Sequence, residues 1–386
     1  MRWIGAIVAV ALIVIIFVDA FESVVLPRRI KHGYRLARLY YQSAWCLWRA
    51  ASRLVPLGRW RGGLLSVFGP LSLFGLLSLW AVGLILGFAL LHWSFRTALG
   101  FPHEVDDHFS TYVYFSGTTF FTLGYGDVVP TRAWGRALSV AEAGIGFGFL
   151  AMVIGYLPVL YQTFSRREIT ISLLDARAGS PPTASELVRR LADAGNLMAV
   201  RPLLIEWESW SAELLESHLS FPVVSYYRSQ HDNQSWIAAL TMILDTSALL
   251  IAAIDGPDAY QARLTFAMAR HTAVDLGLAF QTLPVPTGTD RLSAAGLSAL
   301  RASLSGAGLT LRDAAAVETC LAELRHLYEP IVNALAEYFE FDLPPFEPKT
   351  PPIDNWQTSP WMPSAPGLNS LPAASSKVEL KHEDMH

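Results

Sequence analysis

Long runs of apolar residues dominate the first half of the chain. They cover residues 3–26, 64–93 and 137–164. Each run is long enough for a helix to cross the apolar core of a bilayer, which takes roughly 20 residues. We therefore predict three membrane-spanning helices, the first of which forms residues 1–26. A cleaved signal peptide is the alternative for this first run, but no small-x-small cleavage site follows it cleanly.

A shorter amphipathic stretch, residues 109–121, lies between the last two apolar runs. It predicts a helix that enters the membrane without crossing it, which is allowed only where protein or a water-filled cavity surrounds it. The C-terminal end of such a helix would direct the negative end of its dipole toward a cation. The loop that follows it consists of Thr122, Leu123, Gly124, Tyr125, Gly126 and Asp127.

The residue types in this loop suit the binding of a cation that has lost its water. Backbone carbonyls that point inward can replace the hydration shell. Successive carbonyls face one side only when the backbone angles alternate, and Gly124 and Gly126 adopt positive φ values without a Cβ penalty. Thr122 can add a hydroxyl oxygen at the inner mouth. Asp127 can attract cations at the outer mouth or form a hydrogen bond behind the loop, as Thr118 would allow.

The distribution of charge predicts the orientation in the membrane. The chain is 52% hydrophobic and only 16% charged, which is too apolar for an ordinary soluble protein of this size. No acidic residue lies in residues 28–102, whereas residues 28–61 carry nine Lys and Arg interleaved with Tyr and Trp. Basic loops stay on the cytoplasmic side, so we predict that residues 27–63 form a cytoplasmic interfacial segment rather than a voltage sensor. The N-terminus is then outside, together with the acidic residues Glu104, Asp106 and Asp107.

The order of span, re-entrant helix, loop and span resembles the pore module of potassium channels, and the loop matches their filter pattern Thr-x-Gly-Tyr/Phe-Gly. The resemblance covers residues 64–164. It implies that four copies of the chain assemble and that potassium passes along rings of backbone carbonyls from Thr122, Leu123, Gly124, Tyr125 and Gly126. Leu123 stands where the pattern often has Val, which should be tolerated because only its carbonyl would face the ion.

Further expectations follow from the same resemblance. Many relatives carry a Trp pair in the pore helix, and Tyr114 and Phe115 occupy those positions here, where they could form a cuff around Tyr125. The family's hinge glycine corresponds to Gly146 in the inner helix. Pro158 lies lower on the same helix and should kink it near its inner end.

Glu142 lies one turn before Gly146, inside the third predicted span. An ionisable residue is costly there and is a candidate functional residue by default. It could tune the cavity or bind the back of the filter. A hydrogen-bonded structural role is equally compatible with the sequence, and both interpretations stay open.

The second half of the chain is predicted to contain an all-α cytoplasmic domain, residues 165–342. Thr183 and Glu186 form a capping box at the start of one helix. Asp245, at the centre of the apolar run 236–254, would cost roughly 3 kcal/mol in a membrane, so this run is interpreted as the central helix of a soluble bundle. The other expected helices begin at Pro202 or cover residues 258–280, 290–305 and 311–341. Residues 343–386 are rich in Pro and Ser and are predicted to be a disordered tail.

The sequence identifies no ligand for this domain. No Gly-x-Gly-x-x-Gly follows a strand pattern, so a nucleotide-binding regulatory fold is not supported. Glu206, Glu208, His218 and His231 could gather into a ligand or metal pocket. The two histidines lack a compact metal-ligand spacing, and helix caps or hydrogen bonds in the core are the more frequent roles of such residues.

These observations predict a potassium-selective channel in the cell membrane, with the N-terminus outside and the C-terminal domain in the cytoplasm. We expect a passive homotetramer gated at the inner helices and regulated by the cytoplasmic domain, with the lipid bilayer and potassium ions as partners. We expect no enzymatic activity, no cofactor and no nucleic acid. The alternatives are a less selective cation channel, the pore subunit of a potassium-uptake system, and a membrane-anchored sensor or enzyme with a vestigial pore.

Overall fold

The computed structural model describes residues 2–24, 36–56, 58–100, 108–195, 199–231, 233–253, 257–285, 290–306, 312–348 and 353–367. The chain forms two compact units. The first combines Met1–Glu168 with Glu213–Asp232, and the second combines Ile169–Ala212 with Asn233–His386. The described residues are almost entirely helical, and the one described sheet has two short strands. The predicted fold class, a helical membrane protein, is confirmed.

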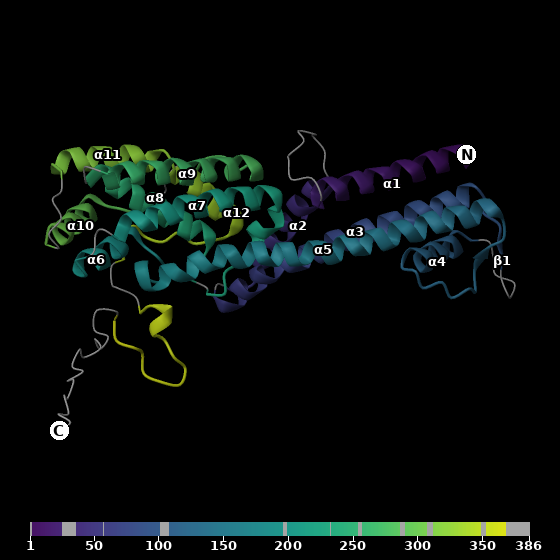
Figure 1. Ribbon diagram of the computed structural model, residues 1–386, viewed down its shortest axis with the longest axis horizontal. Helices are drawn as coiled ribbons and strands as arrows, with labels where there is room; N and C mark the ends of the chain where they lie inside the picture. The colour runs from purple at the N-terminus through teal and green to yellow at the C-terminus, as the bar shows by residue number, and fades with distance from the viewer. Residues whose placement is uncertain are drawn as a thin grey trace, which may run out of the picture. The chain divides into compact units, whose positions relative to one another are not determined.

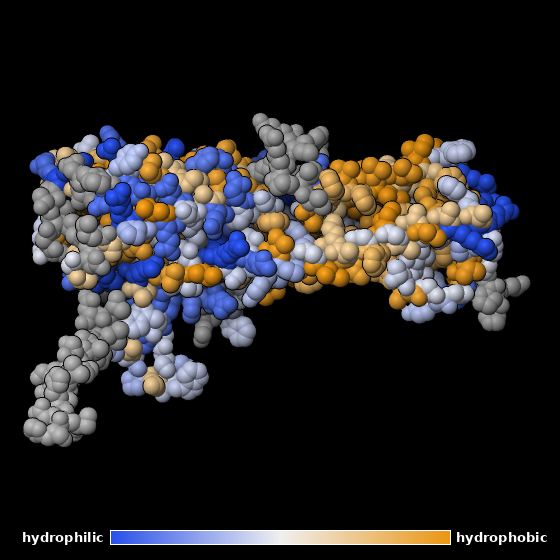
Figure 2. Space-filling view, viewed as in Figure 1, coloured by the Kyte–Doolittle hydropathy of each residue, from blue (hydrophilic) through white to orange (hydrophobic). Residues whose placement is uncertain are grey.

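Helices α1 (Arg2–Val24) and α3 (Arg59–Ser94) lie antiparallel in the first unit (Figure 1). The rings of Trp3 and Phe95 contact each other with centroids 6.4 Å apart, at the beginning of α1 and the end of α3. Gly83 lets the two helices approach closely, because a Cβ there would lie 2.4 Å from Cδ1 of Ile16. Both helices are long and apolar enough to cross a membrane. Figure 2 shows an apolar surface over α1 and the helices beside it.

Helix α2 (Leu36–Ser52) lies in the predicted interfacial segment, residues 27–63, but the last residues of that segment, 59–63, belong to α3. Its first turn is fixed by Asp19 of α1, whose carboxylate accepts a hydrogen bond from the backbone N of Ala37 at 3.1 Å and another from Nε1 of Trp80 at 2.9 Å. Asp19 is buried and partnered, as an acidic group in an apolar helix must be. The carboxylate therefore joins α1, α2 and α3.

The elements around the loop of residues 122–127, which we call the filter after the sequence pattern that it matches, follow α3. Strand β1 (Leu99–Gly100) pairs with β2 (Val129–Pro130), and α4 (Phe109–Phe120) leads into the filter. Helix α5 (Ala133–Ala178) is longer than the predicted inner helix, residues 137–164. Its charged residues after position 164 do not end it. The helix ends only at Gly179, which has a left-handed φ of 89° and precedes Pro181.

A segment from the second half of the chain belongs to the first unit. The short 3-10 helix η2 (Pro222–Tyr226) packs against α2 and α3. The ring of Tyr226 lies 5.1 to 6.0 Å from the rings of Tyr41, Trp45 and Phe68. The expected domain boundaries, residues 165–342, are therefore wrong for this segment. Its buried apolar residues are not distinguished in the sequence from the core of the second unit.

The second unit is a helical bundle around α8 (Trp236–Ala253) (Figure 1). Every residue of α8 is buried, and the helix contacts α6 (Ala184–Asp193), α9 (Pro257–Phe280), α11 (Ala314–His326) and α12 (Glu329–Phe339). Arg291 forms an ion pair with Asp245, and the Tyr328 hydroxyl donates to the same carboxylate at 2.5 Å. The structure agrees with the interpretation of α8 as the central helix of a bundle.

The remaining helices are α7 (Val200–Ser220) and α10 (Ala294–Gly306). The single helix expected over residues 311–341 is wrong, because α11 ends at His326 and α12 begins at Glu329. Pro330 explains the break, since proline has no amide hydrogen for the preceding turn. The expected cap at Thr183 is present, with its side chain accepting a hydrogen bond from the backbone N of Glu186.

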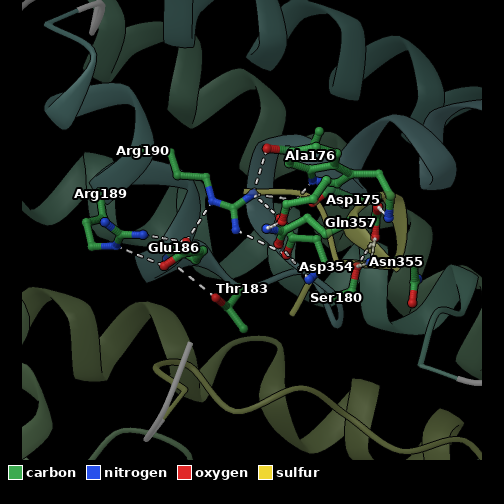
Figure 3. Close-up of polar contacts among 12 residues, drawn as sticks. Asp175, Ala176, Ser180, Thr183, Glu186, Arg189, Arg190, Asp354, Asn355 and Gln357 are labelled. Carbon is green, nitrogen blue, oxygen red and sulfur yellow. Dashed lines mark hydrogen bonds and ion pairs between the residues drawn. The ribbon is translucent and has the colours of Figure 1, made fainter. Parts of the chain in front are cut away.

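The prediction of a disordered tail over residues 343–386 is wrong for residues 343–348, where Phe346 is fully buried, and for residues 353–367. Asp354, just before η3 (Asn355–Gln357), forms an ion pair with Arg190, with an N–O distance of 2.8 Å. Figure 3 shows the two side chains facing each other. The carboxylate of Asp175, at the end of α5, accepts a hydrogen bond from the backbone N of Trp356 at 2.8 Å. Charged partners far away in the sequence therefore order this Pro-rich segment. Residues 349–352 and 368–386 lie outside the described part of the chain.

Candidate ion-conducting site

The backbone of the filter alternates in handedness at every second residue. The φ angles are 57° at Thr122, 55° at Gly124 and 79° at Gly126. Glycine adopts such angles freely, but they are uncommon for a β-branched residue such as Thr122. The expected alternation is therefore present, and it extends one position further than the glycines indicated.

The filter is hydrogen-bonded to the end of the pore helix α4. The carbonyl oxygen of Thr118 accepts hydrogen bonds from the backbone N of Leu123 at 2.8 Å and of Gly124 at 3.4 Å. The backbone N of Thr122 donates to the carbonyl of Thr119 at 3.0 Å. The position of α4 consequently determines where the filter begins.

The outer end of the filter is fixed by Asp127. Its carboxylate accepts a hydrogen bond from the hydroxyl of Tyr114 at 2.7 Å. Thr118, the partner that the sequence suggested, instead donates from its hydroxyl to the Phe115 carbonyl at 2.9 Å. The tyrosine that replaces a Trp of the pore helix therefore supplies the hydrogen bond behind the filter.

The filter has no cover within one chain. All six residues 122–127 are exposed, and Tyr125 is 69% exposed. Phe115 is buried against the ring of His92, with centroids 5.2 Å apart, and Tyr114 is bonded to Asp127. One chain therefore does not form the expected aromatic cuff around Tyr125.

Glu142 of α5 is fully buried behind the pore helix. Its carboxyl group is hydrogen-bonded to the hydroxyl of Ser116 in α4, and Oε2 lies 3.5 Å from Nε2 of His92 in α3. In a single chain it therefore contacts the back of α4 and does not line an open cavity. Its predicted role in gating stays a prediction.

Gly146 marks a close contact between α5 and the end of α4. A Cβ at this position would lie 1.9 Å from the carbonyl oxygen of Phe120. Gly144 and Gly148 have open space around the corresponding position. The structure thus gives Gly146 a packing role, while its predicted role as a hinge, like that of Pro158 inside α5, stays a prediction.

The possible cytoplasmic pocket is not formed as the sequence suggested. His218 is fully buried, with Nε2 lying 3.2 Å from Nη1 of Arg167. Glu206 pairs with Arg177, Glu208 accepts a hydrogen bond from Gln261, and His231 is exposed. Among the residues that the structure describes, no three His, Cys, Asp or Glu are placed to hold a metal ion.

Arg167 of α5 is the centre of a buried group of hydrogen bonds. It is buried and donates from Nη1 to the carbonyl of Val224 at 3.0 Å and from Nη2 to that of Tyr227 at 2.9 Å. Burial lowers the pKa of His218 well below its ordinary value, and the adjacent positive charge of Arg167 lowers this pKa further. His218 is thus held neutral beside a permanent cation.

Sequence reasoning did not identify His92, Ser116 or Asp19 as members of polar contacts. A lone polar residue in an apolar run was the available signal, but its partners come from other helices. The acidic residues Glu104, Asp106 and Asp107, expected at the outer mouth, lie outside the described residues.

Comparison with known proteins agrees with this geometry. Residues 77–162 match the protein family described as ion channel. This part of the chain is therefore similar to ion-channel pore modules. The matched segment contains the second half of α3, all of α4, the filter and α5 as far as Gln162. The matched segment thus includes every residue of the filter.

A relative from Bacillus subtilis (strain 168) carries the description "Uncharacterized membrane protein YdjJ". It is 28% identical to this chain over 221 residues. The match covers 57% of the present chain and 62% of the relative, less than two thirds of its length. No solved structure matches the chain.

Proposed function

We propose that the protein is a potassium-selective channel that conducts passively through a ring of four identical filters. The observation that carries this proposal is the alternating backbone at Thr122, Gly124 and Gly126 within a pore module. Such a backbone can turn successive carbonyl oxygens toward one side, where they replace the water of a cation. The filter pattern Thr-x-Gly-Tyr-Gly favours potassium as that cation.

The uncovered surface of the pore module supports assembly. In one chain the filter is exposed, and α5 exposes large apolar side chains, among them Val140, Phe147, Leu150 and Ile154. Apolar surface of this size is covered by lipid or by another protein surface. A single filter strand provides only part of an ion's coordination shell, and four copies would complete it.

Gating is proposed to occur at the inner ends of the four copies of α5. This helix continues without interruption from Ala133 to Ala178, so its last residues are part of the second unit. The second unit is proposed to regulate this gate. Residues 28–61 carry nine Lys and Arg, and the positive-inside rule favours a cytoplasmic position for this end of the proposed channel.

Reconstitution into liposomes tests the proposal. The purified chain should form a tetramer and release potassium much faster than sodium. Gly124→Ala should abolish the flux without preventing assembly, because its φ of 55° disfavours a side chain. Gly63→Ala is the matched control, since this helical glycine of α3 has open space around it.

The outcomes separate the alternatives. Equal flux of potassium and sodium would overturn the selectivity claim and leave a less selective cation channel. Flux that survives Gly124→Ala would show that the filter does not carry the ions. A monomer that conducts would overturn the assembly of four filters.

A further inference from the structure

A buried polar cluster joins three helices behind the filter. It contains His92 of α3, Ser116 of α4 and Glu142 of α5, and the side chains of all three are fully buried. The conduction path described above uses none of these side chains. Burying polar and ionisable groups at membrane depth is costly, so their presence calls for a role.

Counting protons defines the state of this cluster. The Ser116 hydroxyl lies 2.8 Å from the carbonyl oxygen of Ile85 and is also hydrogen-bonded to the carboxyl group of Glu142. A hydroxyl carries one proton and can donate to only one of these two acceptors. Both bonds form at once when Ser116 donates to Ile85 and a protonated Glu142 donates to Ser116.

The same count continues through His92. Its Nε2 faces Oε2 of Glu142 at 3.5 Å, and its Nδ1 lies 3.0 Å from the hydroxyl of Thr97. With the proton on Nε2, the ring directs a donor at Glu142 and accepts a hydrogen bond from Thr97. Every member is then neutral, which avoids the cost of placing ions in a site without water.

The cluster lies one helical turn from the contact that sets the filter. Ser116 and Phe120 are four residues apart on α4, and Glu142 and Gly146 are four residues apart on α5, so each pair lies on one face of its helix. Glu142 contacts Ser116, and the backbone of Gly146 lies against the carbonyl of Phe120. Two consecutive turns of α4 are therefore fixed against α5.

We propose that His92, Ser116 and Glu142 form a neutral hydrogen-bonded clamp that positions the pore helix and thereby maintains the spacing of the filter carbonyls. This inference rests on the proposed function, because it assigns positioning residues to that same filter. Apolar packing alone tolerates small sliding movements, whereas directional hydrogen bonds fix the position of α4 along and around its axis. The position of α4 in turn fixes the filter, because the backbone N of Leu123 and of Gly124 donate to the Thr118 carbonyl.

Substitutions of Glu142 distinguish a neutral clamp from a charged site. Glu142→Gln keeps the pattern, because the amide can donate to Ser116 while its carbonyl accepts from His92. Glu142→Leu keeps the approximate size but removes the hydrogen bond to Ser116 and the polar contact with His92. Ser116→Ala removes the α4 partner with a smaller change. Ser139→Ala is the control, because this hydroxyl of α5 donates only to the carbonyl of Gly135 in its own helix.

Two measurements are made on the full-length reconstituted protein. Hydrogen–deuterium exchange of residues 109–127 reports how firmly α4 and the filter are held, and liposome flux reports the ratio of potassium to sodium permeability. Glu142→Leu and Ser116→Ala should accelerate exchange and lower the permeability ratio by roughly tenfold, the equivalent of one lost hydrogen bond. Glu142→Gln and Ser139→Ala should behave as the wild type in both measurements.

Hydrogen exchange tests the clamp, and liposome flux tests the proposed function, so the two can be contradicted separately. Unchanged exchange in Glu142→Leu and Ser116→Ala would overturn the clamp, even in a selective channel. Accelerated exchange in Glu142→Gln would overturn its neutral state and favour an ion pair. A wild type that does not discriminate between the ions would contradict the proposed function, while exchange would still decide whether the cluster holds α4.

Discussion

Helices α5 and α8 contain stretches of similar hydropathy in opposite surroundings. Each contains an 18-residue stretch apolar enough to cross a membrane, yet this stretch is 100% buried in α8 and only 17% buried in α5. The bundle surrounding α8 also supplies Arg291 and Tyr328 as partners for Asp245. Helix α5 has no such cover within its own chain. Apolar length alone therefore does not identify a membrane span; the cover provided by the rest of the fold distinguishes the two helices.

The largest expected effect comes from truncating a side chain in each helix. Leu244→Ala in α8 removes a fully buried side chain and should lower the free energy of unfolding by about 2–5 kcal/mol. Phe147→Ala in α5 removes a side chain that is 68% exposed in one chain, so the isolated protomer should unfold as the wild type does. Thermal unfolding in detergent, followed by circular dichroism, measures both. A comparable loss in the two variants would show that α5 is covered by its own chain.

A smaller effect is expected where α5 contacts α4. Gly146→Ala places a methyl group against the Phe120 carbonyl and should cost about 1–3 kcal/mol through overpacking, because a backbone atom cannot easily move away. Conduction should fall as the filter is displaced. Gly148→Ala, two residues further along, meets open space in one chain and is the control. Equal loss of flux and thermal stability in both variants would contradict the packing role of Gly146.

The sequence predicted what depends on local composition. Apolar runs identify α1, α3 and α5, and glycine identifies positions of positive φ in the filter. Contacts between distant residues were not predictable in this way. His92 and Glu142 are 50 residues apart and meet only after three helices pack. Asp175 and Asp354 order a Pro-rich segment through partners that no local pattern connects.

Some predicted helix and domain boundaries were wrong because they too depend on contacts between distant residues. The polar end of α5 reads as the start of a separate domain, although charged residues do not stop a helix. Residues 222–226 are apolar in sequence and equally compatible with either unit, so only packing against α3 assigns them to the first. Pro330, by contrast, is a local signal that divides α11 from α12.

The smallest predicted effect concerns pH at His218. Burial, followed by the charge of Arg167, lowers the pKa of folded His218 well below its ordinary value of about 6.5. The unfolded chain therefore binds a proton on acidification that the folded chain does not. Above pH ~6.5 His218 is neutral in both states, and the free energy of unfolding has its full value. Below pH ~6.5 only the unfolded chain binds the proton, so the free energy of unfolding falls by up to ~1.4 kcal/mol per pH unit until folded His218 is itself protonated.

His218→Gln should remove this part of the acid sensitivity. The measurement is the thermal midpoint of the full chain between pH ~7.5 and ~5.5, combined with hydrogen exchange of residues 222–227. His231→Gln is the control, because His231 is exposed. The wild type and the control should lose protection in this segment on acidification, since protonated His218 would face the Arg167 cation that holds the Val224 and Tyr227 carbonyls. If His218→Gln retains the full acid-induced loss, another group is responsible. The pH dependence of residues 222–227 would then not come from the buried pair of His218 and Arg167.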